Sequence, residues 1–413
     1  MGELVRAGEA HLQTGPFGTQ LSASEYVPVG IPVINVRNVG FGHIRADDLE
    51  YVSEAKAEQL HHHILRAGDI VFGRKGAVER HALIGPNQDG WVQGSDCLRL
   101  RLRSPSFSER FVSFYLRTQA HQDWMQALCS FGATMSSLNQ DIVNRIQLPC
   151  PPRPIQERIA AILTTYDGLI ANNQRRIALL ESVAEEIYRE WFVRMRFPGH
   201  GSTSFNKGLP SDWEPSKLGS IANFVMGQSP SSEHYNEAGQ GLPFHQGVGT
   251  YGPRFPEHSV FCSVDGRLAK PGNILFSVRA PVGRLNIADT ELIIGRGLAA
   301  MSHKQGFNTY LFYLLRTTFA NEDMIGNGSI FNSVGKDELA GQPILKPNQG
   351  LIEEFERVVG PIDEQLGVLY STATRLARIR DQLLPRLISG KLRIDHLDIQ
   401  FPPSIKVDVP QAA

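Results

Sequence analysis

The sequence predicts an α+β protein in which two similar α/β domains are joined by two long antiparallel coiled-coil helices. Three observations predict this fold class. The sequence contains an internal repeat, with an offset of about 200 residues between the two copies. Each copy ends in a heptad-like apolar pattern about forty positions long. Short β-type segments separated by Gly- and Pro-rich turns fill most of the remainder.

The composition describes a soluble, globular chain. Of its 413 residues, 41% are hydrophobic and 20% are charged, and this length favours roughly two or three domains over one core. No apolar run approaches the ~18–20 residues of a membrane-spanning helix, and the N-terminus lacks the apolar core of a signal peptide. The cytoplasm is therefore the expected location, and no membrane partner is expected.

The cysteines and the net charge exclude several kinds of site. Cys97, Cys129, Cys150 and Cys262 are widely scattered, with no CxxC pair and no histidine at ligand spacing. We therefore expect reduced, structural cysteines, no metal site and no cofactor. The formal net charge of −1 gives no global attraction to nucleic acid. DNA binding would have to depend on local basic clusters or on partner subunits.

The internal repeat appears in matched segments whose spacing changes along the chain. Gly68 of LRAGDIVF corresponds to Gly272 of AKPGNILF, a spacing of 272 − 68 = 204 residues. FYLRT and YLLRT lie 313 − 114 = 199 apart, and GATMSSLNQD and GSIFNSVGKD lie 328 − 132 = 196 apart. Pro151 and Pro347 keep the spacing of 347 − 151 = 196, as do the helices that follow. Loop lengths have therefore changed while the helices have not, which indicates a shared spacing role. The alternative is a duplicated fold without functional meaning.

The two long helices are predicted from residues that step by three or four. The steps alternate throughout the second copy, and the first contains one four-residue stutter near Asn173. At ~1.5 Å per residue each run spans roughly 55 Å, whereas core helices of one large α/β domain usually have ~10–14 residues. We expect the two apolar seams to pack together, with Asn173 and Arg380 fixing the register. The seam comprises Ile159, Ile162, Tyr166, Ile170, Asn173, Ile177, Leu180, Ala184, Ile187 and Trp191, then Phe355, Val359, Ile362, Leu366, Leu369, Ala373, Leu376, Arg380, Leu383 and Leu387.

Proline and glycine mark the ends of these helices. Prolines at 151, 152 and 154 suit a helix entry, where the missing N–H is not needed. Gly360-Pro361 predicts a kink or a restart inside the second helix. Gly390 is typical of a C-terminal cap.

Outside the long helices, the two copies contain the same kinds of predicted strands and helices. IPVINV, DIVFG and NILFSV predict strands, while ERFVSFYLRTQAHQDWMQAL and NTYLFYLLRTTFANEDM predict helices. The Gly-, Ser- and Pro-rich segment 197–217 predicts a linker at a domain boundary. The predicted division is a first domain at 1–150, a first long helix at 151–197, a second domain at 198–347, a second long helix at 348–392 and a C-terminal tail at 393–413.

Several of these segments together resemble a known family. They are the TGPFGTQL-type start, the AGDIVF strand, the junction LPCPPRPIQERIAAIL that leads into a long helix, and a more divergent second copy. The most specific positions of the junction are Pro151, Gln156, Ile159, Asp167 and Ile170. Over nearly its whole length the chain is similar to the DNA-specificity subunit of type I restriction-modification systems.

The resemblance implies a subunit that recognises DNA and catalyses nothing. It implies two target-recognition domains, each reading one half of a split sequence in double-stranded DNA. The paired helices would set the gap and dock two methyltransferase subunits, and restriction and translocase subunits would join the full complex. This chain departs from the family at Glu353-Glu354, which replaces the usual glutamine-bearing pair. Its first copy also lacks the Trp-containing opening that the second shows at 212–222.

Candidate DNA contacts are basic or polar residues in loops after the predicted strands, because Arg, Lys, Asn and Gln reach base edges in the major groove. A single arginine is more often an ordinary surface charge, but a basic loop follows the same strand in both halves. Thr14, Gly15, Gln228 and Ser229 begin loops that could offer backbone amides. The candidates are Arg37, Asn38, Arg74, Lys75, Arg80 and His81 in the first domain, and His245, Gln246, Arg254, Arg279 and Arg284 in the second.

No catalytic set is recognisable in the sequence. A methyltransferase would need a DPPY- or NPPF-type motif, which IQFPPS does not match. A nucleoside triphosphatase would need GxxxxGK[ST], which GSIFNSVGKD does not match. A nuclease core from Pro210, Asp212, Glu214 and Lys217 has unsuitable spacing, since two residues separate Glu214 from Lys217, and it lies in a linker. The HHH segment at 61–63 lacks a metal-ligand constellation. The alternatives to a specificity subunit are a protein–protein scaffold and a stand-alone DNA-binding regulator.

The constant spacing of 196 residues through both helices leads to a mechanical hypothesis. The helices are expected to hold the two domains against one face of B-DNA, with half-site centres ~34–36 Å apart. Four residues inserted near Asn173, equal to ~6 Å of helix, should then lengthen the unread gap and leave both half-sites intact.

Overall fold

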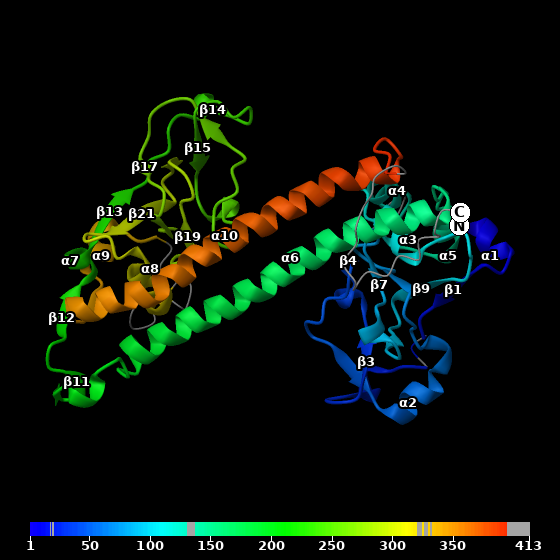
Figure 1. Ribbon diagram of the computed structural model, residues 1–413, viewed down its shortest axis with the longest axis horizontal. Coiled ribbons are helices and arrows are strands. Elements are labelled where there is room, and N and C mark those ends of the chain that lie inside the picture. The colour runs from blue at the N-terminus through cyan, green and yellow to red at the C-terminus, as the bar shows by residue number, and fades with distance from the viewer. Residues whose placement is uncertain are drawn as a thin grey trace, which may run out of the picture. The chain divides into compact units, whose positions relative to one another are not determined.

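The computed structural model describes residues 1–16, 18, 20–129, 137–319, 324–325, 329–330 and 333–394. The chain divides into unit 1, Met1–Ile170 with Arg375–Ala413, and unit 2, Ala171–Thr374. Two long helices contribute to both units, α6 (Arg153–Tyr188) and α10 (Gln349–Ile388) (Figure 1). Among the described helices, none is long and apolar enough to cross a membrane. The predicted tail beyond Ile394 and much of GATMSSLNQD and GSIFNSVGKD lie outside the described residues.

Unit 1 contains an α/β domain with a five-stranded and a four-stranded sheet. Strand β6 is buried along its whole length, which is why its sequence, IVFG, is an unbroken apolar run. Its residues Ile70 and Phe72 pack with Val112 and Leu116 of α3 in the core. The five-stranded sheet has the order β1 (Ala10–Thr14), β9 (Cys97–Leu102), β6 (Ile70–Gly73), β7 (His81–Leu83), β4 (Phe41–Gly42), and the four-stranded sheet β2 (Tyr26–Val27), β5 (Glu50–Val52), β3 (Ile31–Ile34), β8 (Val92–Gln93). The helices are α1 (Gly2–Arg6), α2 (Glu54–Gln59), α3 (Glu109–Leu116), α4 (Gln119–Cys129) and α5 (Gln140–Asn144).

Unit 2 contains a second α/β domain built on the same plan. Its main sheets have the orders β13 (Ala222–Met226), β21 (Leu298–His303), β18 (Ile274–Ser277), β19 (Leu285–Ile287), and β14 (Tyr235–Asn236), β16 (Phe261–Cys262), β15 (Leu242–His245), β20 (Leu292–Ile294), β17 (Leu268–Ala269). Small pairs join β10 (Phe205–Asn206) to β11 (Leu209–Pro210), β12 (Glu214–Lys217) to β24 (Pro343–Lys346), and β22 (Met324–Ile325) to β23 (Ser329–Ile330). The helices are α7 (Leu218–Ile221), α8 (Asn308–Thr318) and α9 (Lys336–Gly341).

The two domains share their sheet order. The order β1-β9-β6-β7 in unit 1 has its counterpart in β13-β21-β18-β19 of unit 2. In the other sheet, the parallel pair β3/β8 has its counterpart in the parallel pair β15/β20. The predicted fold class of two similar α/β domains with two long helices is confirmed.

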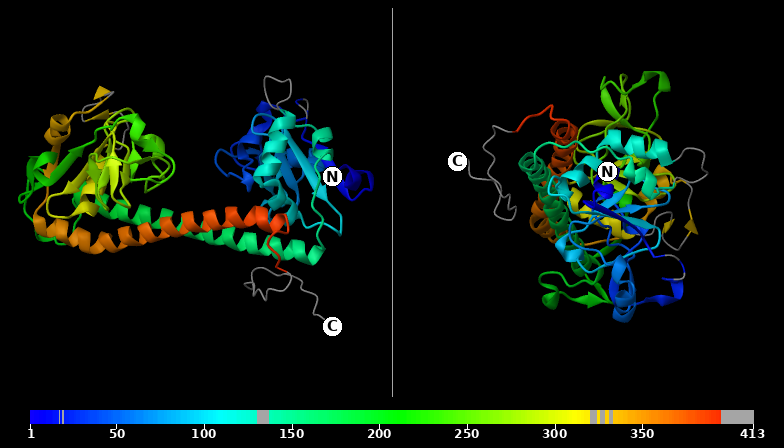
Figure 2. Two further views of the ribbon diagram at one scale, coloured as in Figure 1. Left: turned by 90° about the horizontal axis from the view of Figure 1, so that it is seen from above. Right: turned by 90° about the vertical axis from the view of Figure 1, so that its right-hand side faces the viewer.

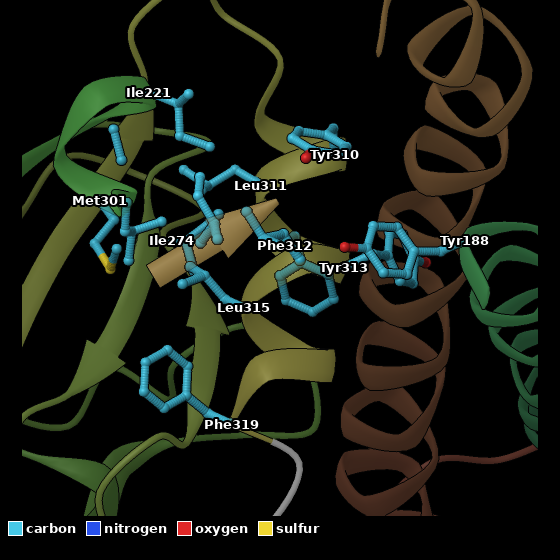
Figure 3. Packing of buried hydrophobic residues seen from close by; sticks show 14 of the residues in the cluster. Tyr188, Ile221, Ile274, Met301, Tyr310, Leu311, Phe312, Tyr313, Leu315 and Phe319 are labelled. Atoms are coloured by element: carbon cyan, nitrogen blue, oxygen red, sulfur yellow. The ribbon is translucent and has the colours of Figure 1, made fainter. Parts of the chain in front are cut away.

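Helix α8 shows how the domain of unit 2 packs on the long helices (Figure 3). Its Leu311 and Leu315 point toward Ile274 of the sheet, while Tyr313 points the other way, toward Tyr188 of α6. The ring centroids of Tyr188 and Tyr313 lie 6.3 Å apart. The apolar residues of NTYLFYLLRTT therefore serve two contacts at once, which explains why this helix is apolar around most of its circumference.

Helices α6 and α10 pair in opposite directions in each unit (Figure 2). In unit 1 the start of α6 meets the end of α10, where Leu163 packs in one cluster with Leu384 and Leu387. In unit 2 Ile177 packs with Leu366 and Leu369, so residue numbers rise along one helix as they fall along the other. Helix α6 ends in a π-helical turn at Arg189–Val193, which keeps Phe192 buried.

The restart predicted at Gly360-Pro361 is wrong, because α10 is helical without interruption from Gln349 to Ile388. A proline inside a helix costs ~3 kcal/mol through its missing N–H and its steric clash. Phe355, Val359 and Leu366 on either side are fully buried, and this burial outweighs the local cost. The predicted cap at Gly390 is confirmed, since its φ of 70° lies in the left-handed region that glycine tolerates.

The predicted linker 197–217 is more ordered than its composition suggests. It carries β10 and β11, and its last strand, β12, pairs with β24. Phe197 and Trp213 are buried and stack with ring centroids 5.6 Å apart. Two aromatic side chains therefore anchor a segment that is otherwise Gly- and Ser-rich.

Candidate nucleic-acid interface

In unit 2, four loops meet at one edge of the sheets and form what we call loop cluster 2, residues 227–230, 246–250, 278–284 and 295–297. Strands β15 and β20 are parallel, with His245 paired to Ile294, so their carboxyl ends emerge side by side. The Gln228 N–H donates to the Ile294 carbonyl (3.0 Å), and the Val278 N–H donates to the Gly297 carbonyl (2.9 Å). Backbone hydrogen bonds thus tie loops that are distant in sequence into one surface.

Unit 1 contains the corresponding loop cluster 1, residues 14–16, 35–38, 74–80 and 94–96. Strands β3 and β8 are parallel, with Ile34 paired to Gln93. The Gly94 N–H donates to the Ile34 carbonyl (2.9 Å), and the Arg74 N–H donates to the Asp96 carbonyl (2.9 Å). Both domains therefore present the same four loops at the same edge.

Two glycines hold each cluster tightly together. A Cβ atom on Gly15 would lie 1.9 Å from the Gly94 carbonyl oxygen, and one on Gly227 would lie 2.1 Å from the Gly295 carbonyl oxygen. No side chain fits at either position, so the first loop of each cluster packs directly on the last. This close backbone approach produces a rigid base on which neighbouring side chains are displayed.

The predicted DNA contacts differ in exposure. Lys75, Gln246, Arg279, Arg284 and Arg37 are exposed, whereas Arg74 and Arg80 are half-buried. Lys75 pairs with Asp96 of the same cluster (Nζ–Oδ1 3.2 Å), and both side chains are about half exposed, so water screens the pair. Arg37 likewise pairs with Glu50 (Nη2–Oε2 3.0 Å) at the surface of its loop.

Asn38, His81 and His245 are instead buried. The Asn38 side-chain oxygen accepts from the Asn35 N–H (3.1 Å), and its amide donates to the carbonyls of Arg45 and Asp47 (3.1 and 2.9 Å). His81 lies on β7 with its Nε2 2.9 Å from the Ser113 Oγ of α3. Asn38 thus shapes its loop and His81 joins sheet to helix.

Arg254, a residue of the second domain, is buried, and its Nη2 pairs with the Asp363 carboxylate of α10. Its guanidinium carbon lies 5.7 Å from the centre of the Phe312 ring. Arg80 makes a similar contact, with its guanidinium carbon 5.5 Å from the centre of the Phe41 ring. The sequence indicated cations at both places but could not show that they face the interior.

One exposed residue of loop cluster 2 was missed by the sequence reasoning. Arg296 stands between Gly295 and Gly297 directly after β20. Its signal was available, because LIIGRG places a basic residue between two glycines at the end of an apolar strand. The signal was weak because LII is short and its neighbour β15 ends 47 residues upstream (292 − 245), so nothing local identified the shared edge.

In unit 1 the long helices are joined to the domain by a shared carboxylate. Asp167 of α6 accepts from Arg117 Nη1 at the end of α3 and from Arg380 Nη1 of α10, both at 2.7 Å. Burial alone would raise the pKa of Asp167, but the two arginines outweigh it and hold that pKa below its ordinary value. Arg380, predicted as a register-fixing seam residue, thus has its partner on the facing helix.

Gln156 fastens the first turn of α6 to the same domain. Its side-chain oxygen accepts from the Ser108 N–H (2.9 Å), and its amide donates to the carbonyls of Ser106 (2.7 Å) and Pro151 (2.8 Å). At the spacing of 196 the corresponding residue of α10 is Ile352, which is buried in the core of unit 2. This one position is therefore polar in the first copy and apolar in the second.

The predicted seam residues of the helix pair differ in burial. Ile159, Ile177, Leu366 and Leu369 are buried, as is the polar Asn173. The partly buried members are Ile162, Tyr166, Leu180, Ile187, Trp191, Ile362, Ala373, Leu376, Arg380 and Leu383. Leu163, which is fully buried, was not predicted.

Buried neutral histidines predict a loss of stability in acid. Burial lowers the pKa of His81 to about 3 and that of His245 to about 4, from 6.5. Between these values the unfolded chain binds protons that the folded chain does not, so stability falls as the pH drops from about 6.5 towards about 4. We expect the melting temperature to fall over this range, with a smaller slope in His81→Gln. An unchanged slope by calorimetry would contradict this.

Three comparisons with known proteins bear on this surface. The family model described as "Type I restriction modification DNA specificity domain" matches residues 25–182 and 210–352. A putative type I restriction enzyme MjaX specificity subunit from Methanocaldococcus jannaschii is 28% identical over 377 residues, covering 89% of this chain and 88% of that protein. The type I restriction enzyme MjaIX specificity subunit of the same organism is 23% identical, covering 70% of each. The crystal structure of a type I restriction-modification system S subunit from M. genitalium has a TM-score of 0.61 at 19% identity, covering 92% of this chain and 93% of that one, a likeness of fold.

Proposed function

Because the chain belongs to the type I restriction modification DNA specificity family, we propose that each of its α/β domains reads one half of a bipartite DNA target. The family recognised from the sequence is confirmed, and so is the prediction of a specificity subunit rather than an enzyme. The partners in this proposal are double-stranded DNA, two methyltransferase subunits, and restriction and translocase subunits. A cytoplasmic location, where these partners would meet, is part of the same proposal.

One observation carries the proposal, namely that loop clusters 1 and 2 have the same backbone frame and different side chains. Asn35 and Ser95 of cluster 1 occupy the places of Gln246 and Arg296 of cluster 2. A shared frame with exchanged hydrogen-bonding groups suits two readers of different sequences, because base edges are distinguished by donor and acceptor patterns. The near-neutral net charge suggests that partner subunits supply much of the phosphate binding.

The long helices suit a spacing and docking role. Each runs without a break through both units, and the fixed 196-residue spacing preserves their register. We propose that this helix pair sets the number of unread base pairs and offers the surface on which the methyltransferase subunits dock.

The test is co-expression with the cognate methyltransferase, followed by sequencing of the methylated genome. The proposal expects a split target that appears only when both proteins are present. A scaffold, the first alternative, expects no sequence-dependent protection in any assembly. A stand-alone regulator, the second, expects tight and specific binding by this chain alone.

Lys75 and Arg74 provide a local test of reading by unit 1. If either residue contacts a base, replacing it by Ala should relax only the first half-site, by ~1–3 kcal/mol. Arg103→Ala is the matched control, because Arg103 is exposed at the opposite end of β9 from loop cluster 1. Equal losses at both half-sites in a binding assay with variant targets would count against a reading role for these residues.

A further inference from the structure

In loop cluster 2, one hydroxyl group joins the side chain of Gln246 to the backbone of Arg296. Ser229 Oγ donates to Gln246 Oε1 (2.8 Å), and the same Oγ accepts from the Arg296 N–H (3.2 Å). The three residues follow three different strands, β13, β15 and β20. A side chain and a loop that would otherwise move independently are thereby held next to each other.

The backbone around Arg296 leaves room for one outward side chain only. A Cβ atom on Gly295 would lie 2.8 Å from Gln246 Oε1, and one on Gly297 would lie 2.5 Å from the Gln246 carbonyl oxygen. The Gly297 N–H donates to that same carbonyl (3.1 Å). The Gly-Arg-Gly turn is thus pressed against Gln246, and its arginine is the exposed member.

Ser229 also orients the Gln246 amide. A hydroxyl that accepts from the Arg296 N–H has its own proton to donate, and Gln246 Oε1 is its acceptor. In this arrangement the oxygen end of the amide meets Ser229. Gln246 then keeps its Nε2 donor and a second lone pair on Oε1, which is the pattern that pairs with N7 and N6 of adenine. Arg296 offers the forked donors that pair with O6 and N7 of guanine.

From this geometry we infer that Arg296 and Gln246 read a guanine and a neighbouring adenine in the second half-site, with Ser229 as the positioning residue. The inference rests on the proposed function and adds the identity of the bases. In loop cluster 1 the amide of Asn35 donates to Glu50 (2.6 Å) and a serine stands in the place of Arg296, so unit 1 is not expected to read this pair.

The test uses the complex of this chain with its methyltransferase subunits. Targets keep the first half-site fixed and vary every position of the second, and binding is measured for each. The wild-type complex should require guanine at one position and adenine beside it. Arg296→Ala should reduce discrimination at the guanine by about 5- to 150-fold, and Gln246→Ala should do so at the adenine. Arg296→Gln should move the preference from guanine toward adenine at the position where the wild-type complex requires guanine.

Ser229→Ala tests positioning separately from contact. It removes no group that reaches a base, and should lower discrimination at the adenine more than at the guanine, because only Gln246 loses a side-chain bond. The matched control is Lys304→Ala. Lys304 is an exposed cation of the same domain and directly follows β21, whereas loop cluster 2 precedes that strand. This replacement should leave the half-site unchanged.

Two outcomes separate this inference from the proposed function. A second half-site without the guanine–adenine pair, or an Arg296→Ala complex weakened equally on all targets, would overturn the inference, since the latter indicates a phosphate contact. Both outcomes would leave bipartite reading intact. A wild-type complex indifferent to sequence in both halves would refute the proposed function itself.

Discussion

Four residues inserted into each long helix should widen the unread gap of the target by one or two base pairs without changing either half-site. The insertions belong after Ile170 in α6 and before Arg375 in α10, where the chain passes from one unit to the other. Four helical residues add ~6 Å, and a base pair spans ~3.4 Å along the duplex. Both helices must be lengthened, because they run in opposite directions and pack along their seams.

The control for this experiment is the same insertion in α6 alone, the change that the sequence led us to expect would lengthen the gap and that the pairing of the seams argues against. It should put one seam out of register with the other and lower stability, since Leu163 and Ile177 could no longer both meet their partners on α10. The measurement is methylome sequencing of cells that carry the chain and its methyltransferase. An unchanged gap after the double insertion, with both half-sites still read, would refute the spacing role of the helices.

Replacement of Asp167 by Ala should destabilise unit 1 by roughly 2–4 kcal/mol. The carboxylate accepts from two arginines whose side chains are only 13% and 18% exposed, and its loss leaves both with fewer partners in a poorly solvated place. The range lies below that of a fully buried pair because Asp167 itself is one-third exposed. Urea unfolding followed by intrinsic fluorescence measures the change.

Asp381→Ala is the matched control for Asp167→Ala. Asp381 also pairs with Arg380 (2.8 Å), but its side chain is 61% exposed, and surface pairs contribute ~0–1 kcal/mol. If the two replacements cost the same, the shared carboxylate would not be what joins the domain to the helix pair.

The sequence was most informative where structure depends on periodic burial. The long helices were predicted because the apolar residues of a coiled-coil seam recur every three or four positions, so each helical turn contributes to the signal. Leu163 was still missed, because Ile162 was taken as the seam residue, although positions 159, 163, 166 and 170 keep alternating steps of four, three and four. The restart at Gly360-Pro361 was wrongly predicted for the opposite reason, since a local propensity was weighed without the fully buried Val359 beside it.

The DNA-facing candidates divide in the same physical way. Their location in loops after strands was readable, because basic and polar residues follow apolar runs in both copies. Which of them face outward was not, because Asn38 and Arg254 acquire their partners from residues elsewhere in the fold. The Arg254 partner, Asp363, lies 109 residues away.

By itself, then, the sequence determined the duplication, the two long helices and the family, because these depend on patterns that recur along the chain. Only the tertiary structure decided that Arg254 is buried, that one carboxylate serves two arginines, and that Gln246 and Arg296 share one hydroxyl. The physical reason is that the partners in each contact lie far apart in sequence, as they do where a parallel strand pair brings together two strand ends with a long crossover between them. No local pattern records which residues meet at that edge.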